Sequence, residues 1–179
     1  MAAVGAAVAA GVDFSDACRF ANIPVPVEGR MQKISADEPF SVYVDYAHTP
    51  AALYETLYAL RQITGGRLIV VFGCGGDRDR AKRPQMGEIA SALADVTVLT
   101  SDNPRSEDPL QIINEIAAGF KSKKELILCA DRRTAIGTAI GKAQNGDCVL
   151  IAGKGHEKTQ QTAGLTLAFD DVRVAQSFF

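Results

Sequence analysis

Residues 73–84 concentrate the chemical groups best suited to bind an anion. Their sequence is Gly-Cys-Gly-Gly-Asp-Arg-Asp-Arg-Ala-Lys-Arg-Pro, so three glycines, three arginines and a lysine fall within twelve positions. Glycine lets the backbone turn sharply or approach a ligand closely. Arginine offers a planar, permanently charged fork that pairs with carboxylate or phosphate. The segment therefore predicts a loop that holds an anionic group.

The loop 73–84 directly follows the apolar run 68–72, and three other polar clusters likewise lie at the ends of apolar runs. Asp45, Tyr46 and His48 lie at the end of the run 41–46, the segment 101–105 (Ser-Asp-Asn-Pro-Arg) follows another run, and the segment 153–157 (Gly-Lys-Gly-His-Glu) follows a third. If these runs are parallel strands of one sheet, all four clusters meet at its carboxyl edge, where such sheets bind ligands. We expect one ligand site there.

Familiar catalytic and nucleotide motifs do not fit this site. The dinucleotide fingerprint Gly-x-Gly-x-x-Gly fails because Arg78 stands at the third glycine. The P-loop pattern fails at Gly155, which replaces its Ser or Thr, and at Cys148, which replaces its first glycine. Neither a His-x-x-x-His metal spacing nor a Gly-x-Ser-x-Gly elbow occurs. The predicted site is a carboxyl-edge site of another kind.

Each polar residue also has a structural interpretation on its own. His48 could cap or stack, the segment 102–104 could be an ordinary turn, and Arg105 could be a solvated surface charge. The charges at 77–80 could pair among themselves, and Glu157 could cap a helix. All of these interpretations would have to hold together to remove the site.

Apolar runs alternate with amphipathic segments from residue 41 onward. The expected strands are 41–46, 68–72, 96–100, 126–129, 148–152 and 165–169. The runs are continuously apolar, which indicates that helices cover both faces of the sheet. This order predicts an α/β fold with a doubly wound, mainly parallel, Rossmann-like sheet of about six strands.

Capping residues and apolar spacing place the helices. Thr49, Asp108 and Asp131 are expected N-caps. The expected helices are 1–11, 16–22, 50–64, 84–94, 109–120, 132–144 and a last one from 170. We expect Ser15 to cap the helix at 16–22, and the inward-facing residues are expected to include Phe20, Ile63 and Leu110.

Composition limits the class of protein. A chain of 179 residues with a hydrophobic fraction of 47% suits one well-packed domain, and a net charge of −2 does not favour a nucleic-acid partner. No run is long enough to span a membrane, and the alanine-rich start lacks the basic region of a signal peptide. Four cysteines without a Cys-x-x-Cys pair indicate reduced residues of a cytoplasmic protein, with Cys74 as the one that could react. The prolines and the glycine in 23–29 predict an extended linker and a domain boundary.

Taken together, five motifs resemble the C-terminal domain of the Mur ligases. They are the segments 45–50 (Asp-Tyr-Ala-His-Thr-Pro), 73–79 (Gly-Cys-Gly-Gly-Asp-Arg-Asp), 82–84 (Lys-Arg-Pro), 102–105 (Asp-Asn-Pro-Arg) and 153–157 (Gly-Lys-Gly-His-Glu). Their order and spacing agree across essentially the whole chain. The combination is far more specific than any one motif.

The resemblance implies part of an ATP-dependent ligase of peptidoglycan synthesis, which joins an amino acid to a nucleotide-linked peptide through an acyl phosphate. Residues 1–28 would be the tail of a central ATPase domain and the hinge. Residues 29–179 would hold the incoming amino acid and close over ATP. The chain has no Gly-Lys-[Ser/Thr] loop, so ATP and Mg²⁺ are expected to bind mainly to the central domain. As a fragment of that kind, the chain alone is expected to be inactive.

The resemblance also implies the substrate and its contacts. The Asp-Asn-Pro-Arg form is associated with ligases that add meso-diaminopimelate, rather than lysine, to UDP-MurNAc-L-Ala-D-Glu. The implied diaminopimelate contacts are Arg78, Asp102, Asn103, Arg105, Gly153 and Glu157. The implied ATP contacts are Arg30, Asp45 and His48, and neither a catalytic residue nor a metal ligand is expected. The alternatives are a stand-alone module that binds an amino acid or a nucleotide, and a ligase domain of the folylpolyglutamate or cyanophycin type.

Overall fold

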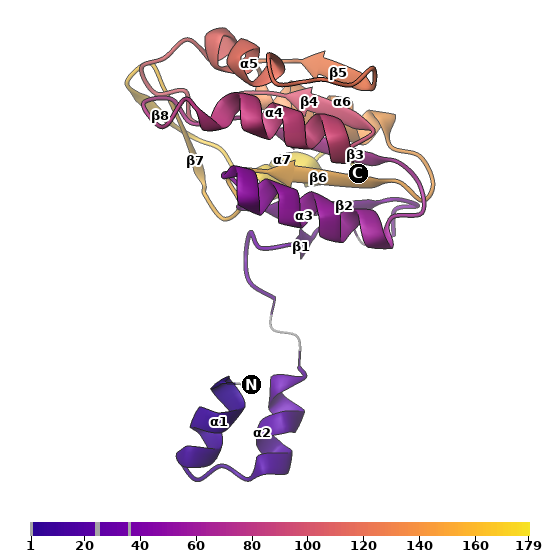
Figure 1. Cartoon of the computed structure of the whole chain (residues 1–179), viewed down its shortest axis with the longest axis vertical. Helices are drawn as coiled ribbons and strands as arrows, with labels where there is room; N and C mark the ends of the chain where they lie inside the picture. Colours follow the sequence, from indigo (N-terminus) through magenta and orange to yellow (C-terminus); the bar gives the residue numbers. More distant parts are fainter. Residues whose placement is uncertain (1, 24–25, 36) are drawn as a thin grey trace.

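A computed structural model describes residues 2–23, 26–35 and 37–179. Most of the chain forms a layered α/β body, and two short helices, α1 (Ala2–Ala9) and α2 (Phe14–Ala21), lie apart from it at the N-terminal end (Figure 1). Two positions of the expected linker, Pro24 and Val25, lie outside the described residues, as does Met1 of the first expected helix. None of the helices in the described ranges combines the length and apolar character needed to cross a bilayer.

The central sheet has six strands, five of them parallel. The strands are β1 (Gln32–Lys33), β2 (Ser41–Asp45), β3 (Leu68–Phe72), β4 (Val96–Leu99), β5 (Glu125–Leu128) and β6 (Cys148–Ala152). Their order is β1-β2-β6-β3-β4-β5, and only the edge strand β1 is antiparallel to its neighbour. The predicted doubly wound, mainly parallel sheet is confirmed.

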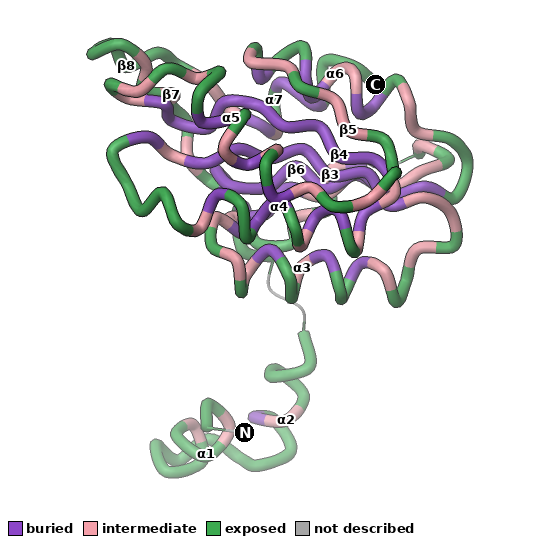
Figure 2. Tube along the Cα trace, turned by 45° about the horizontal axis from the view of Figure 1, so that its top comes forward, coloured by how far each residue is buried: buried purple, intermediate pink, exposed green. Residues whose placement is uncertain are grey.

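Helices cover both faces of this sheet. On one face lie α3 (Pro50–Ile63), α4 (Lys82–Leu93) and α5 (Pro109–Ala117), and on the other lie α6 (Arg132–Lys142) and α7 (Asp171–Gln176). Residues of β3 pack alternately into the two cores, with Leu68 on one side and Ile69 on the other. Figure 2 shows the buried positions concentrated on the strands. A strand covered on both sides has to be apolar at every position.

Side-chain caps begin the helices where the sequence predicts. Thr49 Oγ1 accepts a hydrogen bond from the Ala52 amide at 3.3 Å, and the Asp108 and Asp131 carboxylates accept from amides of the first turns of α5 and α6. These bonds satisfy amide groups that a helix start otherwise leaves unpaired. Each cap directs the chain from a strand end into the next helix.

The expected sixth strand at 165–169 was wrong as a member of the main sheet. Residues Leu165–Ala168 form β8, which pairs with β7 (Thr159–Thr162) in a separate antiparallel hairpin. The hairpin turns at Ala163 and Gly164, whose φ angles are 46° and 77°. Two adjacent residues with positive φ make the tight turn that joins antiparallel strands. The sixth strand of the sheet is instead β1.

Several details of the helices also differ from expectation. Asp13, not Ser15, caps α2, because its carboxylate accepts hydrogen bonds from the Ser15 and Asp16 amides. The helix thus begins at Phe14. Three residues expected to face inward are exposed: Phe20, Ile63 and Leu110. Ile63 is the last residue of α3 and Leu110 lies in the first turn of α5, so both extend past the core contacts of their helices.

Candidate functional site

A cavity of about 430 Å³ opens at the carboxyl edge of the sheet. Strand β6 lies between β2 and β3 in the sheet. The chain leaves β2 and β3 toward α3 and α4 on one face, whereas after β6 it passes through the β7–β8 hairpin to α7 on the other face. The loops therefore diverge at this edge, as at the ligand sites of other open α/β sheets. We call this cavity the edge pocket. Its lining residues come from the four predicted loops: Tyr46, His48, Thr49, Gly75, Arg78, Asp79, Lys82, Asp102, Asn103, Arg105, Gly153 and Glu157.

The edge pocket brings together seven of the nine site residues expected from the sequence. All six expected diaminopimelate contacts line it, and so does His48 from the expected ATP contacts. Arg30 and Asp45 do not line it. Sequence positions up to 109 residues apart, from His48 to Glu157, thus converge on one site.

The loop 73–84 packs closely against the loop after β4. A Cβ atom on Gly73 would lie 2.0 Å from the Thr100 carbonyl oxygen, and one on Gly76 would lie 1.9 Å from the Pro104 carbonyl oxygen. No side chain fits at either position, so these glycines allow the two backbones to touch. The close approach places Arg78 and Arg105 on the same side of the pocket.

A buried arginine anchors this loop to α5. Arg83 has no exposed side-chain surface, and its guanidinium donates to Glu107 at 2.9 Å and to Glu115 at 2.7 Å. Arg80 also pairs with Glu115, at 2.6 Å. Hydrogen bonds from Arg83 lower the pKa of Glu107 to about 2. The pKa of Glu115 is also lowered, chiefly by the hydrogen bond from Arg80.

The remaining charges of the loop hold its backbone rather than Arg78. Asp77, with a φ of 54°, accepts a hydrogen bond from the Ser106 hydroxyl at 2.6 Å, and Asp79 accepts from the Ala81 amide at 2.9 Å. Within the described residues, the only hydrogen bond of the Arg78 guanidinium goes to the Asp77 carbonyl at 3.2 Å. The Arg78 side chain is therefore available to a ligand.

Arg105 is held in place before any ligand arrives. Its Nη1 donates to the Gly76 carbonyl at 2.7 Å and its Nε donates to Gln161 Oε1 at 3.1 Å. Its backbone, with a φ of 52°, pairs with β7 through the Gln161 carbonyl and the Ala163 amide. The β7–β8 hairpin, of which the sequence predicted only the second strand, thus supports the Asn-Pro-Arg turn.

The edge pocket also contains a hydrogen-bond network around Glu157. Lys154 is fully buried, and its Nζ lies 3.1 Å from both Asn103 Oδ1 and Glu157 Oε2. Asn103 Nδ2 also donates to Glu157 Oε2 at 2.9 Å. Burial acts to raise the pKa of Glu157, but the hydrogen bonds from Asn103 and Lys154 outweigh it and leave that pKa lowered. Lys154 was missed as a site residue, because its burial cannot be inferred from the motif.

Asp102 adds a second carboxyl group to this side of the pocket. It is only 7% exposed, and burial raises its pKa despite the nearby cations Arg132 and Lys154. Gly153 adjoins it with a φ of 113°, and a Cβ there would lie 2.5 Å from Asp102 Oδ2. Only glycine fits beside this carboxyl group.

Of the three residues expected to contact ATP, only His48 lines the edge pocket. His48 Nδ1 donates to the Tyr46 carbonyl at 2.8 Å, which leaves Nε2 free for a ligand. The Arg30 guanidinium lies over the Tyr46 ring, with its Cζ atom 4.8 Å from the ring centroid. Asp45 is buried, and its carboxylate accepts from the Met31 amide at 2.7 Å and the Ala47 amide at 2.8 Å. Asp45 therefore shapes the chain around the site rather than facing the pocket.

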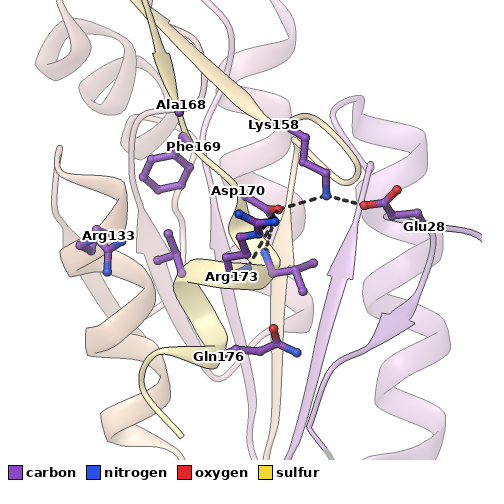
Figure 3. Close-up of a pocket in the computed structure, with 10 residues that line it drawn as sticks. Glu28, Arg133, Lys158, Ala168, Phe169, Asp170, Arg173 and Gln176 are labelled. Atoms are coloured by element: carbon purple, nitrogen blue, oxygen red, sulfur yellow. Dashed lines mark hydrogen bonds and ion pairs between the residues drawn. The ribbon is translucent and has the colours of Figure 1, made fainter.

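A second cavity, of about 810 Å³, lies on another part of the surface, around the start of α7 (Figure 3). Lys158 bridges Glu28 and Asp170 there, at 3.2 Å from the latter, and Arg173 lies 3.7 Å from Asp170. These cations already have acidic partners.

Cysteine chemistry and a metal centre find no support in the described residues. The Cys74 thiol is buried against Met86, and burial raises its pKa to about 12, so it is not the reactive group that its loop position suggested. All four cysteines are free; Cys74 and Cys148 are buried, and Cys18 and Cys129 are half-buried. The described ranges contain no group of three or more His, Cys, Asp or Glu residues able to hold a metal ion.

Comparison with known proteins finds close relatives. A relative from Alkaliphilus metalliredigens, named UDP-N-acetylmuramoyl-L-alanyl-D-glutamate–2,6-diaminopimelate ligase, is 48% identical over 98% of this chain and 36% of its own length. One of the same name from Prochlorococcus marinus is 56% identical over 84% of this chain and 30% of its own length. The chain thus spans about a third of the length of the relatives it matches.

Solved structures give the same result. A structure of a UDP-N-acetylmuramoyl-L-alanyl-D-glutamate–2,6-diaminopimelate ligase has a TM-score of 0.80 and 44% identity, covering 98% of this chain and 36% of that one. The folylpolyglutamate synthase/dihydrofolate synthase from Yersinia pestis, with a TM-score of 0.61 and 24% identity over 77% of this chain and 31% of its own, shares the fold alone. The family described as Mur ligase, glutamate ligase domain, matches residues 29–155, well over half of the chain. The chain therefore belongs to the Mur ligase family.

Proposed function

We propose that residues 29–179 form the amino-acid-binding C-terminal domain of a MurE ligase, which adds meso-diaminopimelate to UDP-MurNAc-L-Ala-D-Glu with ATP. Residues 1–28 would then be the tail of the central ATPase domain and the hinge. The names of the relatives and the resemblance of the five motifs support this function. Since ATP and the nucleotide-linked peptide are cytoplasmic substrates, we place the protein in the cytoplasm.

The observation that carries the proposal is the pairing of opposite charges in the lining of the edge pocket. Arg78 and Arg105 contribute guanidinium groups to it, and Asp102 and Glu157 contribute carboxyl groups. One centre of diaminopimelate carries both a carboxylate and an ammonium, which match these two kinds of group. Lysine has only an ammonium at the corresponding end, so it would leave both arginines without a partner.

The border around His48 suits the phosphates of ATP. Lys82 lies there at the start of α4, and its Nζ donates to the His48 carbonyl at 2.8 Å. No acidic side chain of the described residues pairs with Lys82, so an anionic ligand fits beside it. Arg30 would meet the nucleotide from the linker, with Asp45 holding the neighbouring backbone. When bound, ATP supplies the phosphoryl group that activates the carboxylate of the acceptor peptide. Mg²⁺ would be held mainly by residues outside this chain.

Calorimetry on this chain tests the proposal against its alternatives. We expect binding of meso-diaminopimelate, weaker binding of L-lysine, and no preference for L-glutamate. A preference for L-glutamate would favour a ligase of the folylpolyglutamate type. Binding of a nucleotide with no response to any of the three amino acids would favour a stand-alone nucleotide-binding module. Either result would overturn the proposed substrate.

A further inference from the structure

Lys154 is a buried cation whose place in the site the family motifs do not explain. It lies between Gly153 and Gly155, whose φ angles of 113° and 53° turn the chain sharply on both sides of it. Its side chain has no exposed surface and does not line the edge pocket. A buried ammonium needs an anionic partner and hydrogen bonds to offset its lost hydration. The hydrogen-bond partners of Lys154 therefore indicate its structural role.

Those partners belong to one wall of the edge pocket. Lys154 Nζ donates to Glu157 Oε2 and to Asn103 Oδ1, both at 3.1 Å. Asn103 is fixed in turn, because its Oδ1 also accepts from the Gln161 amide at 2.9 Å and its Nδ2 donates to Glu157 Oε2 at 2.9 Å. Both donors to Glu157 meet the same oxygen. Within the described part of the chain, Glu157 Oε1 has no hydrogen-bond partner, and the side chain is 33% exposed to the pocket.

With both carboxyl groups ionised, Asp102 and Glu157 contribute two negative charges to this wall and Lys154 contributes one positive charge. Burial raises the pKa of Asp102, so this net charge of one negative unit applies to the form with Asp102 ionised. Arg132, the other buried cation nearby, is paired with the buried Asp171 at 2.7 Å. A wall with one net negative charge matches one ammonium group. Without Lys154 the same wall would carry two negative charges and would favour binding an extra proton.

We propose that Lys154 is a positioning residue, which directs Glu157 Oε1 toward the pocket and offsets one carboxylate charge at the ammonium subsite. The inference rests on the proposed function only for the identity of the ligand, diaminopimelate. The positioning of Glu157 is a property of the free chain.

The free chain provides the first test. The titration of the Glu157 carboxyl can be followed by carbon-detected NMR, with its signal assigned by its loss in Glu157→Gln. In Lys154→Met we expect the midpoint of this titration to rise, because a donor and a compensating charge are lost. Lys154→Arg should keep it near the wild-type value. The same pH range also has to cover the other charged or titratable groups of this region, which are His48, Arg78, Asp79, Lys82, Asp102, Arg105, Arg132, His156 and Asp171.

A matched control is available four residues away. The Lys158 ammonium pairs with Glu28 and Asp170 beside the second cavity (Figure 3). Among the described residues, no hydrogen bond or ion pair joins it to the Glu157 carboxylate. Lys158→Met should leave the Glu157 titration unchanged. If Lys154→Met fails to fold, Lys154→Gln keeps a polar donor without the charge and should still raise the midpoint. An unchanged Glu157 titration in a folded Lys154→Met or Lys154→Gln chain overturns the proposal.

The second test adds meso-diaminopimelate to the same chains. The loss of one charge-assisted hydrogen bond predicts roughly ten- to hundredfold weaker binding in Lys154→Met at neutral pH. Binding should weaken as pH falls and Glu157 becomes protonated, and this loss should begin at a higher pH in Lys154→Met than in wild type, because the titration midpoint of Glu157 is higher in the variant. Lys154→Arg should restore most of the affinity. If the wild-type chain does not bind diaminopimelate, the proposed function is contradicted, while the Glu157 titration still decides the role of Lys154.

Discussion

Arg105 offers the sharpest test of how the edge pocket selects its ligand. Its guanidinium is held by the Gly76 carbonyl at 2.7 Å and by Gln161 at 3.1 Å, which orders the side chain before a ligand binds. Because the Arg105 side chain is already ordered in the free protein, ligand binding loses little further side-chain entropy there. We expect Arg105→Ala to weaken the binding of meso-diaminopimelate, which presents a carboxylate to this group.

The expected size of the effect follows from these contacts. A hydrogen bond to a charged group contributes about 1.5–3 kcal/mol. Arg105 Nη2 has no hydrogen-bond partner among the described residues, so a ligand carboxylate can accept one charge-assisted hydrogen bond from it. A second hydrogen bond to the carboxylate would come from Nη1, which also donates to the Gly76 carbonyl. We therefore expect a loss of about 2–4 kcal/mol, which corresponds to a Kd larger by roughly 30- to 1000-fold.

Calorimetry with two ligands separates this effect from general damage. The affinity for L-lysine should change little in Arg105→Ala, because lysine lacks the carboxylate at that end. Arg105→Lys keeps the charge but not the fork, and should recover only part of the loss. Arg173→Ala, at an exposed arginine beside the second cavity, is the matched control and should bind as wild type. An equal loss for both ligands, or no loss for diaminopimelate, would refute the assignment of Arg105.

Three further predictions concern stability, close packing and ATP. Arg83→Met should lower the free energy of unfolding, as measured by chemical denaturation, by about 3 kcal/mol. This value is at the low end for breaking a buried ion pair, because Glu107 is 17% exposed and can be hydrated in the variant. The folded pKa of Glu107, about 2, lies below its ordinary value of 4.5, so wild type should lose stability as pH falls from about 5 toward 2, and Arg83→Met should lose much less of it over that range. Gly153→Ala should destabilise the fold by about 1–3 kcal/mol and weaken diaminopimelate binding. Gly141→Ala, with nothing within 4 Å of the new Cβ, should do neither. Thermal melts measure the stability and calorimetry the binding, and equal values for the two variants would contradict the packing argument. His48→Ala should weaken ATP binding roughly tenfold by removing the free Nε2, without changing diaminopimelate binding; the reverse pattern in a titration with both ligands would mean that the two sites are interchanged.

The sheet and its caps could be predicted because their signals are local. A strand such as 68–72 is apolar at every position, and caps such as Thr49 and Asp131 mark the helix starts within a few residues. The hairpin of β7 and β8 was misplaced for the opposite reason. The alternation in 165–168 reads as a half-buried strand, and only the positive φ angles at 163 and 164 turn it back on β7.

The site was predictable as a set of loops but not in its internal contacts. Once the strand ends are known, the carboxyl edge follows from topology, which is why Arg78, Arg105 and Glu157 were expected together. The burial of Lys154 depends on how the loop after β6 lies against Asn103, which no local pattern encodes. Asp45 differs for a similar reason, since the amides that occupy its carboxylate come from residues two and fourteen positions away.

The central claim is that the edge pocket binds one zwitterionic centre of meso-diaminopimelate. The most direct measurement is an NMR titration of this chain with meso-diaminopimelate at millimolar concentration, read out at assigned backbone and side-chain resonances. The account predicts shifts at Arg78, Asn103, Arg105 and Glu157, with no shift at Arg173 beside the second cavity. Unchanged resonances in the edge pocket, or shifts confined to the second cavity, would contradict it.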